Sequence, residues 1–272
     1  MPDQKKIKLA ILDMYENVPN EGMRCLRTFA QSLGDQVDWK VFDVRYKNEV
    51  PDNNFDIYIS SGGPGSPYDG EGKPWENKYF TLLDKIWAHN QNGHSNKKHF
   101  FAICHSFQLM SRHFELGNVC KRKSPAFGVF PVYKTEIAKQ DHFFRRLPDP
   151  YYVVDSREWQ LIEPDYNKMQ SLGASILAVE KKREHVPLER AVMAIKLSEE
   201  IYMTQFHPEA DAEGMLRYFA NPEKRQIIIN NHGDWKLNDM IQSLSDPYKI
   251  PLTRKEVIPA FLRSSVNEEL MN

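Results

Sequence analysis

The first 110 residues alternate between strand-like and helix-like segments, and this alternation limits the fold more than any other feature of the chain. Apolar or alternating runs that resemble strands occupy residues 7–13, 37–44, 55–60 and 100–103. Helical apolar spacing lies between them, around Leu26 and around Leu82. Strands separated by helices usually pair in parallel and are covered by helices on both faces. We therefore predict an α/β fold.

The second half of the chain is richer in strands. Further strands are expected at 127–135, 151–154, 176–180, 191–197 and 201–206. No helix separates the last three, so some of these strands should be antiparallel. Helical spacing returns over 212–219 and 237–244, and no linker-like change of composition divides the chain. The expected organisation is one domain over 1–220, with a helical C-terminal extension over 221–272 packed on the same domain.

Charge and composition exclude several classes of protein. The formal net charge is −1, which provides no field that would attract nucleic acid or a membrane surface. No apolar run is long enough to span a bilayer, and the N-terminus has no apolar core of a signal peptide. Three irregularly spaced cysteines indicate neither a disulfide framework nor a zinc site. A cytoplasmic protein without a metal is expected.

Cys104 lies where an apolar strand, Phe100–Ile103, is predicted to turn directly into a helix. A nucleophile on such a turn projects above the sheet, and the positive end of the following helix favours a thiolate. Most free cysteines are simply buried packing residues. The small neighbours Ala102 and Ser106 favour the nucleophile, whereas Cys25 and Cys120 have no such context.

His207 and Glu209 follow another predicted strand with the spacing His-x-Glu. A thiol nucleophile needs a base, and a base histidine needs a carboxylate that orients it. Side chains two residues apart on a strand point the same way, so both can face one site. By themselves they would be read as two surface residues, but together with Cys104 they suggest a triad. His105 is the weaker candidate for the base because adjacent residues on a sharp turn diverge.

A glycine-rich run, residues 61–67, ends the predicted strand 55–60. It matches neither the phosphate loop GxxxxGK[ST] nor the GxGxxG fingerprint. Active sites of parallel sheets lie outside the carboxyl ends of the strands, where both this run and Cys104 are found. The backbone N–H groups of Gly63 and His105 are therefore predicted to form an oxyanion hole.

Four motifs occur in an order that resembles a known family. They are Ser60-Ser-Gly-Gly-Pro-Gly-Ser-Pro67, Ala102-Ile-Cys-His-Ser-Phe-Gln108, Phe127-Gly-Val-Phe-Pro-Val132 and Gln205-Phe-His-Pro-Glu209. The chain resembles the class I (triad) glutamine amidotransferases over about residues 7–220. It is most similar to free-standing members that resemble the amidotransferase domain of GMP synthase. The resemblance implies a flavodoxin-like three-layer sandwich with a mixed, mainly parallel central sheet, followed by C-terminal helices.

The same resemblance implies a reaction at these motifs. Cys104 would attack the side-chain amide of glutamine, ammonia would leave, and water would hydrolyse the γ-glutamyl thioester. His207 would transfer the proton and Glu209 would orient it. Gln108 would hold the substrate, and the matching pocket positions are Gly62, Phe127 and Ser156. No cofactor is implied.

Several positions depart from the family pattern. Ala102 and Ser106 replace the glycines two residues before and after the nucleophile, and Ala126 replaces a glutamate. Asp155-Ser156-Arg157 stands where many members have a His-Gly pair. We expect Asp155 to disfavour a substrate carboxylate and Arg157 to be able to pair with one.

Three functions remain open at this point. The first is release of ammonia from glutamine, with the ammonia passing to a separate synthetase subunit. The second is hydrolysis of a γ-glutamyl peptide or conjugate by the same triad. The third is a binding or regulatory module that kept the fold and lost turnover. The C-terminal extension would cover the site, form a homodimer surface or dock a synthetase.

Overall fold

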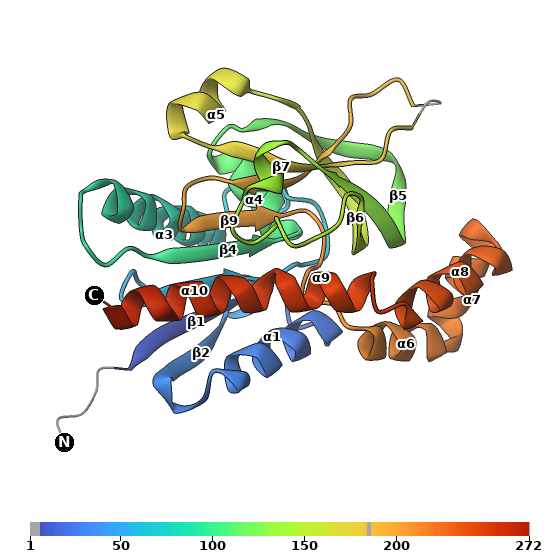
Figure 1. The fold of residues 1–272 in the computed structure, drawn as a ribbon, viewed down its shortest axis with the longest axis horizontal. Coiled ribbons are helices and arrows are strands. Elements are labelled where there is room, and N and C mark those ends of the chain that lie inside the picture. Colours follow the sequence, from blue (N-terminus) through green and yellow to red (C-terminus); the bar gives the residue numbers. More distant parts are fainter. Residues whose placement is uncertain (1–5, 184–185, 272) are drawn as a thin grey trace.

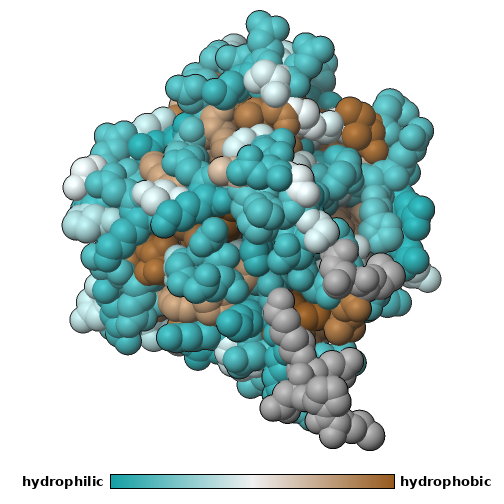
Figure 2. Space-filling view, turned by 90° about the vertical axis from the view of Figure 1, so that its left-hand side faces the viewer, coloured by the Kyte–Doolittle hydropathy of each residue, from teal (hydrophilic) through white to brown (hydrophobic). Residues whose placement is uncertain are grey.

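The structure is a computed structural model and describes residues 6–183 and 186–271. The expected lack of a signal peptide rests in part on residues 1–5, which lie outside the described residues, as does the last residue of the expected extension. Within the described part, no helix combines the length and the apolar character needed to cross a membrane. The face seen in Figure 2 is mostly hydrophilic, with separate hydrophobic patches.

One sheet of nine strands forms the centre of the described protein (Figure 1). The strands are β1 (Ile7–Asp13), β2 (Val37–Asp43), β3 (Ile57–Ser60), β4 (His99–Ile103), β5 (Gly117–Lys134), β6 (Tyr151–Pro164), β7 (Ser175–Glu180), β8 (Val192–Lys196) and β9 (Ile201–Thr204). Their order is β2-β1-β3-β4-β9-β8-β7-β5-β6. The first five of that order run parallel, and the pairs from β9 onward are antiparallel. The mixed, centrally parallel sheet confirms the predicted fold class.

Helices cover both faces of this sheet. They are α1 (Glu21–Ser32), α2 (Val44–Lys47), α3 (Pro74–Gln91), α4 (His105–His113), α5 (Tyr166–Leu172), α6 (Ala212–Ala220), α7 (Pro222–His232), α8 (Asp234–Ser245), α9 (Ile250–Glu256) and α10 (Ile258–Met271). Short 3₁₀ turns occupy Gly34–Gln36 and Ile137–Lys139. Helices α1 and α10 contribute to the core on one face, and α3 and α4 to the core on the other (Figure 1).

A third apolar cluster joins the C-terminal helices to the edge of the sheet. Val129 and Val154 of β5 and β6 pack with residues of α6, α7 and α8, among them Phe219 and Met240. Farther along the chain, Phe261 of α10 is buried against the sheet beside Phe101 of β4, with ring centroids 5.2 Å apart. The C-terminal helices therefore share apolar cores with the strands.

Two strands are longer than the sequence suggested. β5 begins at Gly117 rather than 127, and β6 continues to Pro164 rather than ending at 154. The two pair as an antiparallel ribbon with a register shift between Lys121 and Ala126. Cys120 was expected in a short strand of its own, but charged residues interrupt the apolar alternation after it, so local periodicity did not predict one continuous strand that is defined by its partner.

Candidate active site

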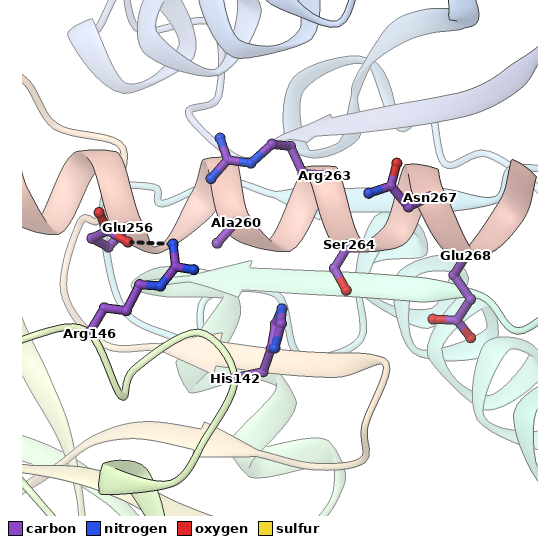
Figure 3. Close-up of a pocket in the computed structure, with 8 residues that line it drawn as sticks. All are labelled: His142, Arg146, Glu256, Ala260, Arg263, Ser264, Asn267 and Glu268. Atoms are coloured by element: carbon purple, nitrogen blue, oxygen red, sulfur yellow. Dashed lines mark ion pairs between the residues drawn. The ribbon is translucent and has the colours of Figure 1, made fainter.

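The larger cavity, of about 790 Å³, lies beside the ends of the parallel strands β1, β3, β4 and β9. Seven of the sequence-predicted site residues line it: Gly63, Cys104, Gln108, Phe127, Ser156, His207 and Glu209. A second cavity, of about 520 Å³, lies between α10 and the segment that holds His142 and Arg146 (Figure 3). None of the predicted site residues lines this second cavity, where Arg146 forms an ion pair with Glu256 (Figure 3).

Cys104 occupies the turn between β4 and α4 in a conformation that is rare for a residue with a side chain. Its φ and ψ angles are 51° and −98°. The turn is held on both sides, because the Cys104 N–H donates to the Thr204 carbonyl at 2.7 Å and the Cys104 carbonyl accepts from the Gln108 N–H at 3.1 Å. The hydroxyl of Ser106 donates to the carbonyl of Ser61 at 2.7 Å, so the extra group fits the tight turn.

His207 and Glu209 form a hydrogen-bonded pair beside Cys104. The distance between His207 Nδ1 and Glu209 Oε1 is 2.8 Å, and Glu209 is 1% exposed. Burial alone would lower the pKa of His207, but the negative charge of Glu209, the neighbouring Cys104 and the hydrogen bond to Glu209 raise it well above its ordinary value. The backbone N–H of His207 donates to the backbone carbonyl of Val154 at 2.9 Å, which connects this turn to β6.

Gly62 and Gly63 approach the site too closely for any larger residue. A Cβ at Gly62 would lie 2.7 Å from His207 Cε1 and 3.5 Å from Cys104 Cβ. A Cβ at Gly63 would lie 2.3 Å from the Met14 carbonyl oxygen. The glycine run therefore borders the nucleophile and the histidine, as its place at a strand end suggested. Gly62 does so without lining the cavity.

Gln108 is connected to the nucleophile through Gln205. The amide nitrogen of Gln108 donates to Gln205 Oε1 at 3.2 Å and to the Trp159 carbonyl at 3.4 Å. The amide nitrogen of Gln205 in turn lies 3.7 Å from Cys104 Sγ as a donor. Gln205 is fully buried and belongs to the Gln-Phe-His-Pro-Glu string, which could have identified it as a site residue.

Strand β6 passes over the nucleophile. The Ser156 carbonyl oxygen lies 3.7 Å from Cys104 Sγ, which donates to it. Phe127 is paired with Ser156 across the β5–β6 ribbon, and its ring centroid lies 5.2 Å from that of Tyr218 in α6. The ribbon thus brings an aromatic pair into the lining of the cavity that contains Cys104.

Asp155 and Arg157, whose effects on a substrate carboxylate we considered separately, form an ion pair with each other. Arg157 Nε donates to Asp155 Oδ2 at 3.0 Å, and Arg157 Nη2 donates to Glu180 Oε2 at 3.0 Å. All three side chains are buried, and Asp155 does not line the cavity. Asp155 and Arg157 lie two residues apart on β6, so their side chains point to the same face of the ribbon. The ion pair neutralises the charge that was expected to disfavour a substrate carboxylate.

Two further residues complete the surroundings of the triad. The side chain of His105 is buried outside the cavity, and burial lowers its pKa to about 3, with Arg45 and Arg112 adding to the effect. Tyr15, which the sequence reasoning missed, lines the cavity two residues after the end of β1. Its hydroxyl lies 3.1 Å from where a Cβ of Gly62 would be. Burial and the nearby charges of the site raise its pKa well above the ordinary value, so it is a neutral donor.

Within residues 6–183 and 186–271, no cluster of three or more His, Cys, Asp or Glu side chains could hold a metal ion. What the cavity does contain is a cysteine on a strained strand-to-helix turn, a histidine with a raised pKa and a carboxylate bonded to that histidine. These groups suit nucleophilic catalysis by a thiol.

Comparison with solved structures shows a shared fold. A glutamine amidotransferase from Thermotoga maritima is 16% identical, with a TM-score of 0.70 and 97% of this chain and 99% of that chain covered. One from Methylobacillus flagellatus is 14% identical, with a TM-score of 0.67 and coverage of 97% and 95%. A putative GMP synthase subunit from Thermoplasma acidophilum is 20% identical, with a TM-score of 0.53 and coverage of 82% and 98%.

No curated protein matched the chain. The family model described as glutamine amidotransferase class-I matches residues 10–221, which is more than half of the chain and includes all four motifs. The protein therefore belongs to the glutamine amidotransferase class-I family.

Proposed function

We propose that the protein hydrolyses the side-chain amide of glutamine through a γ-glutamyl thioester on Cys104. The observation that carries this proposal is the 2.8 Å hydrogen bond between His207 and Glu209, which line the same cavity as Cys104 in a chain of this family. The raised pKa of His207 favours an imidazolium beside a thiolate, which is the reactive form of such a pair.

The reaction would run in two balanced steps. The Cys104 thiolate attacks the amide carbon, a C–S bond forms, the C–N bond breaks, and ammonia leaves with a proton from His207. His207 then takes a proton from water, the hydroxide attacks the thioester, and glutamate leaves as the thiolate returns. Glu209 holds Nδ1 of His207 throughout, so that Nε2 is the nitrogen that exchanges the proton.

The oxyanion of each tetrahedral intermediate would be bound by the backbone N–H groups of Gly63 and His105. His105 is the first residue of α4, where backbone N–H groups have no acceptor within the helix. Gln108, Gly62, Phe127 and Ser156 would surround the substrate. Gln108 would act mainly through Gln205, because its amide nitrogen is already bonded to that residue.

The ammonia would pass to a separate synthetase subunit. The structural neighbours include the putative GMP synthase subunit and the glutaminase domain of Trypanosoma brucei CTPS with bound acivicin. We further propose that residues 1–220 form the amidotransferase domain and that 221–272 are an extension packed on it, which would be available to such a partner.

Thiol labelling tests the nucleophile. A chloromethyl ketone analogue of glutamine should modify Cys104 much faster than Cys25, since burial raises the pKa of the Cys25 thiol to about 12. Ammonia and glutamate should appear from glutamine, and Cys104→Ala should abolish their release. Slow and equal labelling of all three cysteines, with no release of ammonia, would instead identify a binding module without turnover.

A further inference from the structure

The cavity at Cys104 is far larger than a single glutamine requires. Its volume of about 790 Å³ falls in the range of roughly 300–1,000 Å³ that is typical of pockets for drug-sized ligands. Glutamine is one small amino acid, and its leaving group is ammonia. The cavity therefore has room for a group attached to the nitrogen of the amide.

The position of that nitrogen follows from the chemistry. The leaving amine takes a proton from His207, so it must lie within hydrogen-bond reach of this side chain. The chain turns sharply after His207, with the Ala210 N–H donating to the His207 carbonyl at 3.3 Å, and enters α6. Met215 and Tyr218 of α6 line the same cavity as His207 and pack in one apolar cluster with Val154, the strand partner of His207.

This part of the lining is apolar. Met215 and Tyr218 of α6 contribute to it, together with Ile227 and Ile228 of α7 and Phe127 of β5. The Phe127 and Tyr218 rings form a tilted pair, and Phe127 is paired with Ser156, whose carbonyl contacts the nucleophile. Ile227 and Ile228 lie beyond residue 221, where the match to the family ends, so α7 adds to the pocket from outside the matched segment.

Charged side chains nearby already have partners. Asp211 is bonded to Arg24 at 2.6 Å, and Glu21 to Arg217 at 2.8 Å. Further along the lining, the ion pairs are Lys121–Glu158 and Arg157–Asp155. An apolar substituent on the amine would be buried favourably against this lining, whereas a charged one would lose hydration there.

We propose that the preferred substrate is a γ-glutamyl amide of an apolar amine, with the alkyl or aryl group in the space between Phe127, Met215, Tyr218, Ile227 and Ile228. This inference rests on the proposed thioester mechanism and names the substrate of the same site. The Cys104 thiolate adds to the amide carbon to form the C–S bond, the tetrahedral intermediate then loses its C–N bond as the free amine leaves with the proton from His207, and water hydrolyses the thioester to release glutamate and the thiolate.

The experiment compares three substrates with the full chain. They are glutamine, γ-glutamyl-benzylamide and γ-glutamyl-(2,3-dihydroxypropyl)amide, and glutamate release is measured for each. The benzylamide should exceed the dihydroxypropyl amide in kcat/KM by about tenfold or more, because an apolar pocket discriminates on this scale. Glutamine is the control for the reaction at Cys104, because its leaving group, ammonia, has no substituent that could enter the apolar part of the cavity.

Two variants test which side chains cause the preference for the benzylamide. Ile227→Ser changes a side chain that is 58% exposed, so it should fold, and it should lower the benzylamide preference by about threefold or more. The matched control is Leu216→Ser on α6, because Leu216 is 43% exposed but does not line the cavity. This variant should keep the preference of the original protein.

The outcomes separate the two proposals. Hydrolysis of glutamine with no preference for the benzylamide, or with equal effects of Ile227→Ser and Leu216→Ser, would overturn the apolar-amine inference and leave the proposed function standing. Hydrolysis of the benzylamide without that of glutamine would support the inference and overturn glutamine as the substrate. Failure on all three, with an unreactive Cys104, would overturn both.

Discussion

The hydroxyl oxygens of Ser60 and Ser106 lie 2.7 Å apart, and this contact joins the end of β3 to the first turn of α4. Tyr79 donates to Ser60 Oγ at 3.1 Å, and Ser106 donates to the Ser61 carbonyl at 2.7 Å. With Ser60 donating to Ser106, each hydroxyl proton has one acceptor. The serine that replaces a family glycine thus connects the glycine run to the turn that holds Cys104.

Ser106→Ala should destabilise the protein by about 1–3 kcal/mol, because Ser60 and the Ser61 carbonyl would lose buried hydrogen bonds. It should also lower kcat for glutamine, since the glycine run would be held less firmly against the turn. The control is Ser111→Ala, a buried serine of α4 that donates only within its own helix, to the Phe107 carbonyl at 2.8 Å. Denaturant unfolding and ammonia release measure both effects. An equal loss of kcat in the two variants would contradict this role of Ser106.

Glu209→Gln should reduce kcat/KM for glutamine by roughly 10²–10⁴-fold while the fold is retained. Without the carboxylate, burial would lower the pKa of His207 with less opposition. The imidazolium that protonates the leaving amine would be lost at lower pH, so the alkaline limb of the pH–rate profile should move to lower pH. Glu213→Gln, which changes an exposed glutamate of α6, should leave rate and profile unchanged. An unshifted profile in Glu209→Gln would argue against the assigned role of Glu209.

Gly62→Ala should lower kcat on the order of 100-fold, because a displacement of about 1 Å at a reacting group has an effect of this size. The added Cβ would lie 2.7 Å from His207 Cε1, so the ring must move away from Cys104. Measurement of glutamate release, with thermal unfolding as the check on folding, tests this expectation. Normal turnover in a folded variant would show that the imidazole does not need its present position.

Stability should fall as the pH is lowered from about 6.5 towards 4, in part because of two buried histidines. Burial lowers the pKa of His105 to about 3 and that of His99 to about 4, from an ordinary value of 6.5. In this range the unfolded chain binds protons that the folded chain does not, so the free energy of unfolding decreases with falling pH.

The size of this effect can be measured by substitution. Each buried histidine contributes a slope of up to about 1.4 kcal/mol per pH unit, so His105→Gln should reduce the slope by that amount. His142→Gln, which removes an exposed histidine, should leave it unchanged. Denaturant unfolding at several pH values provides the slopes, and identical slopes in the original protein and His105→Gln would contradict the expectation.

Much of the candidate site was accessible from local sequence. A clear local pattern marks the strand before Cys104, the strand before His207 and the glycine run after β3. The carboxyl ends of parallel strands meet at one edge of the sheet, so these segments were expected to lie together. The spacing of His207 and Glu209 also predicted that both would face the same site, and His207 Nδ1 lies 2.8 Å from Glu209 Oε1.

Other features depend on contacts between distant segments, and no local pattern encodes them. Arg157 pairs with Asp155 two residues away but also with Glu180 on another strand, and spacing along the chain gives no sign of this second partner. Tyr15 enters the site only because Gly22 and Gly62, from two different segments, leave space beside its hydroxyl.

The sequence by itself therefore predicted the α/β class, the sharp strand-to-helix turn at Cys104 and the grouping of Cys104 with His207 and Glu209, because these follow from periodicity and short spacings. Only the tertiary structure decided how the site is enclosed. The β5–β6 ribbon, α6 and α7 meet through apolar packing across long sequence separations, and that packing determines which of their side chains line the cavity at Cys104.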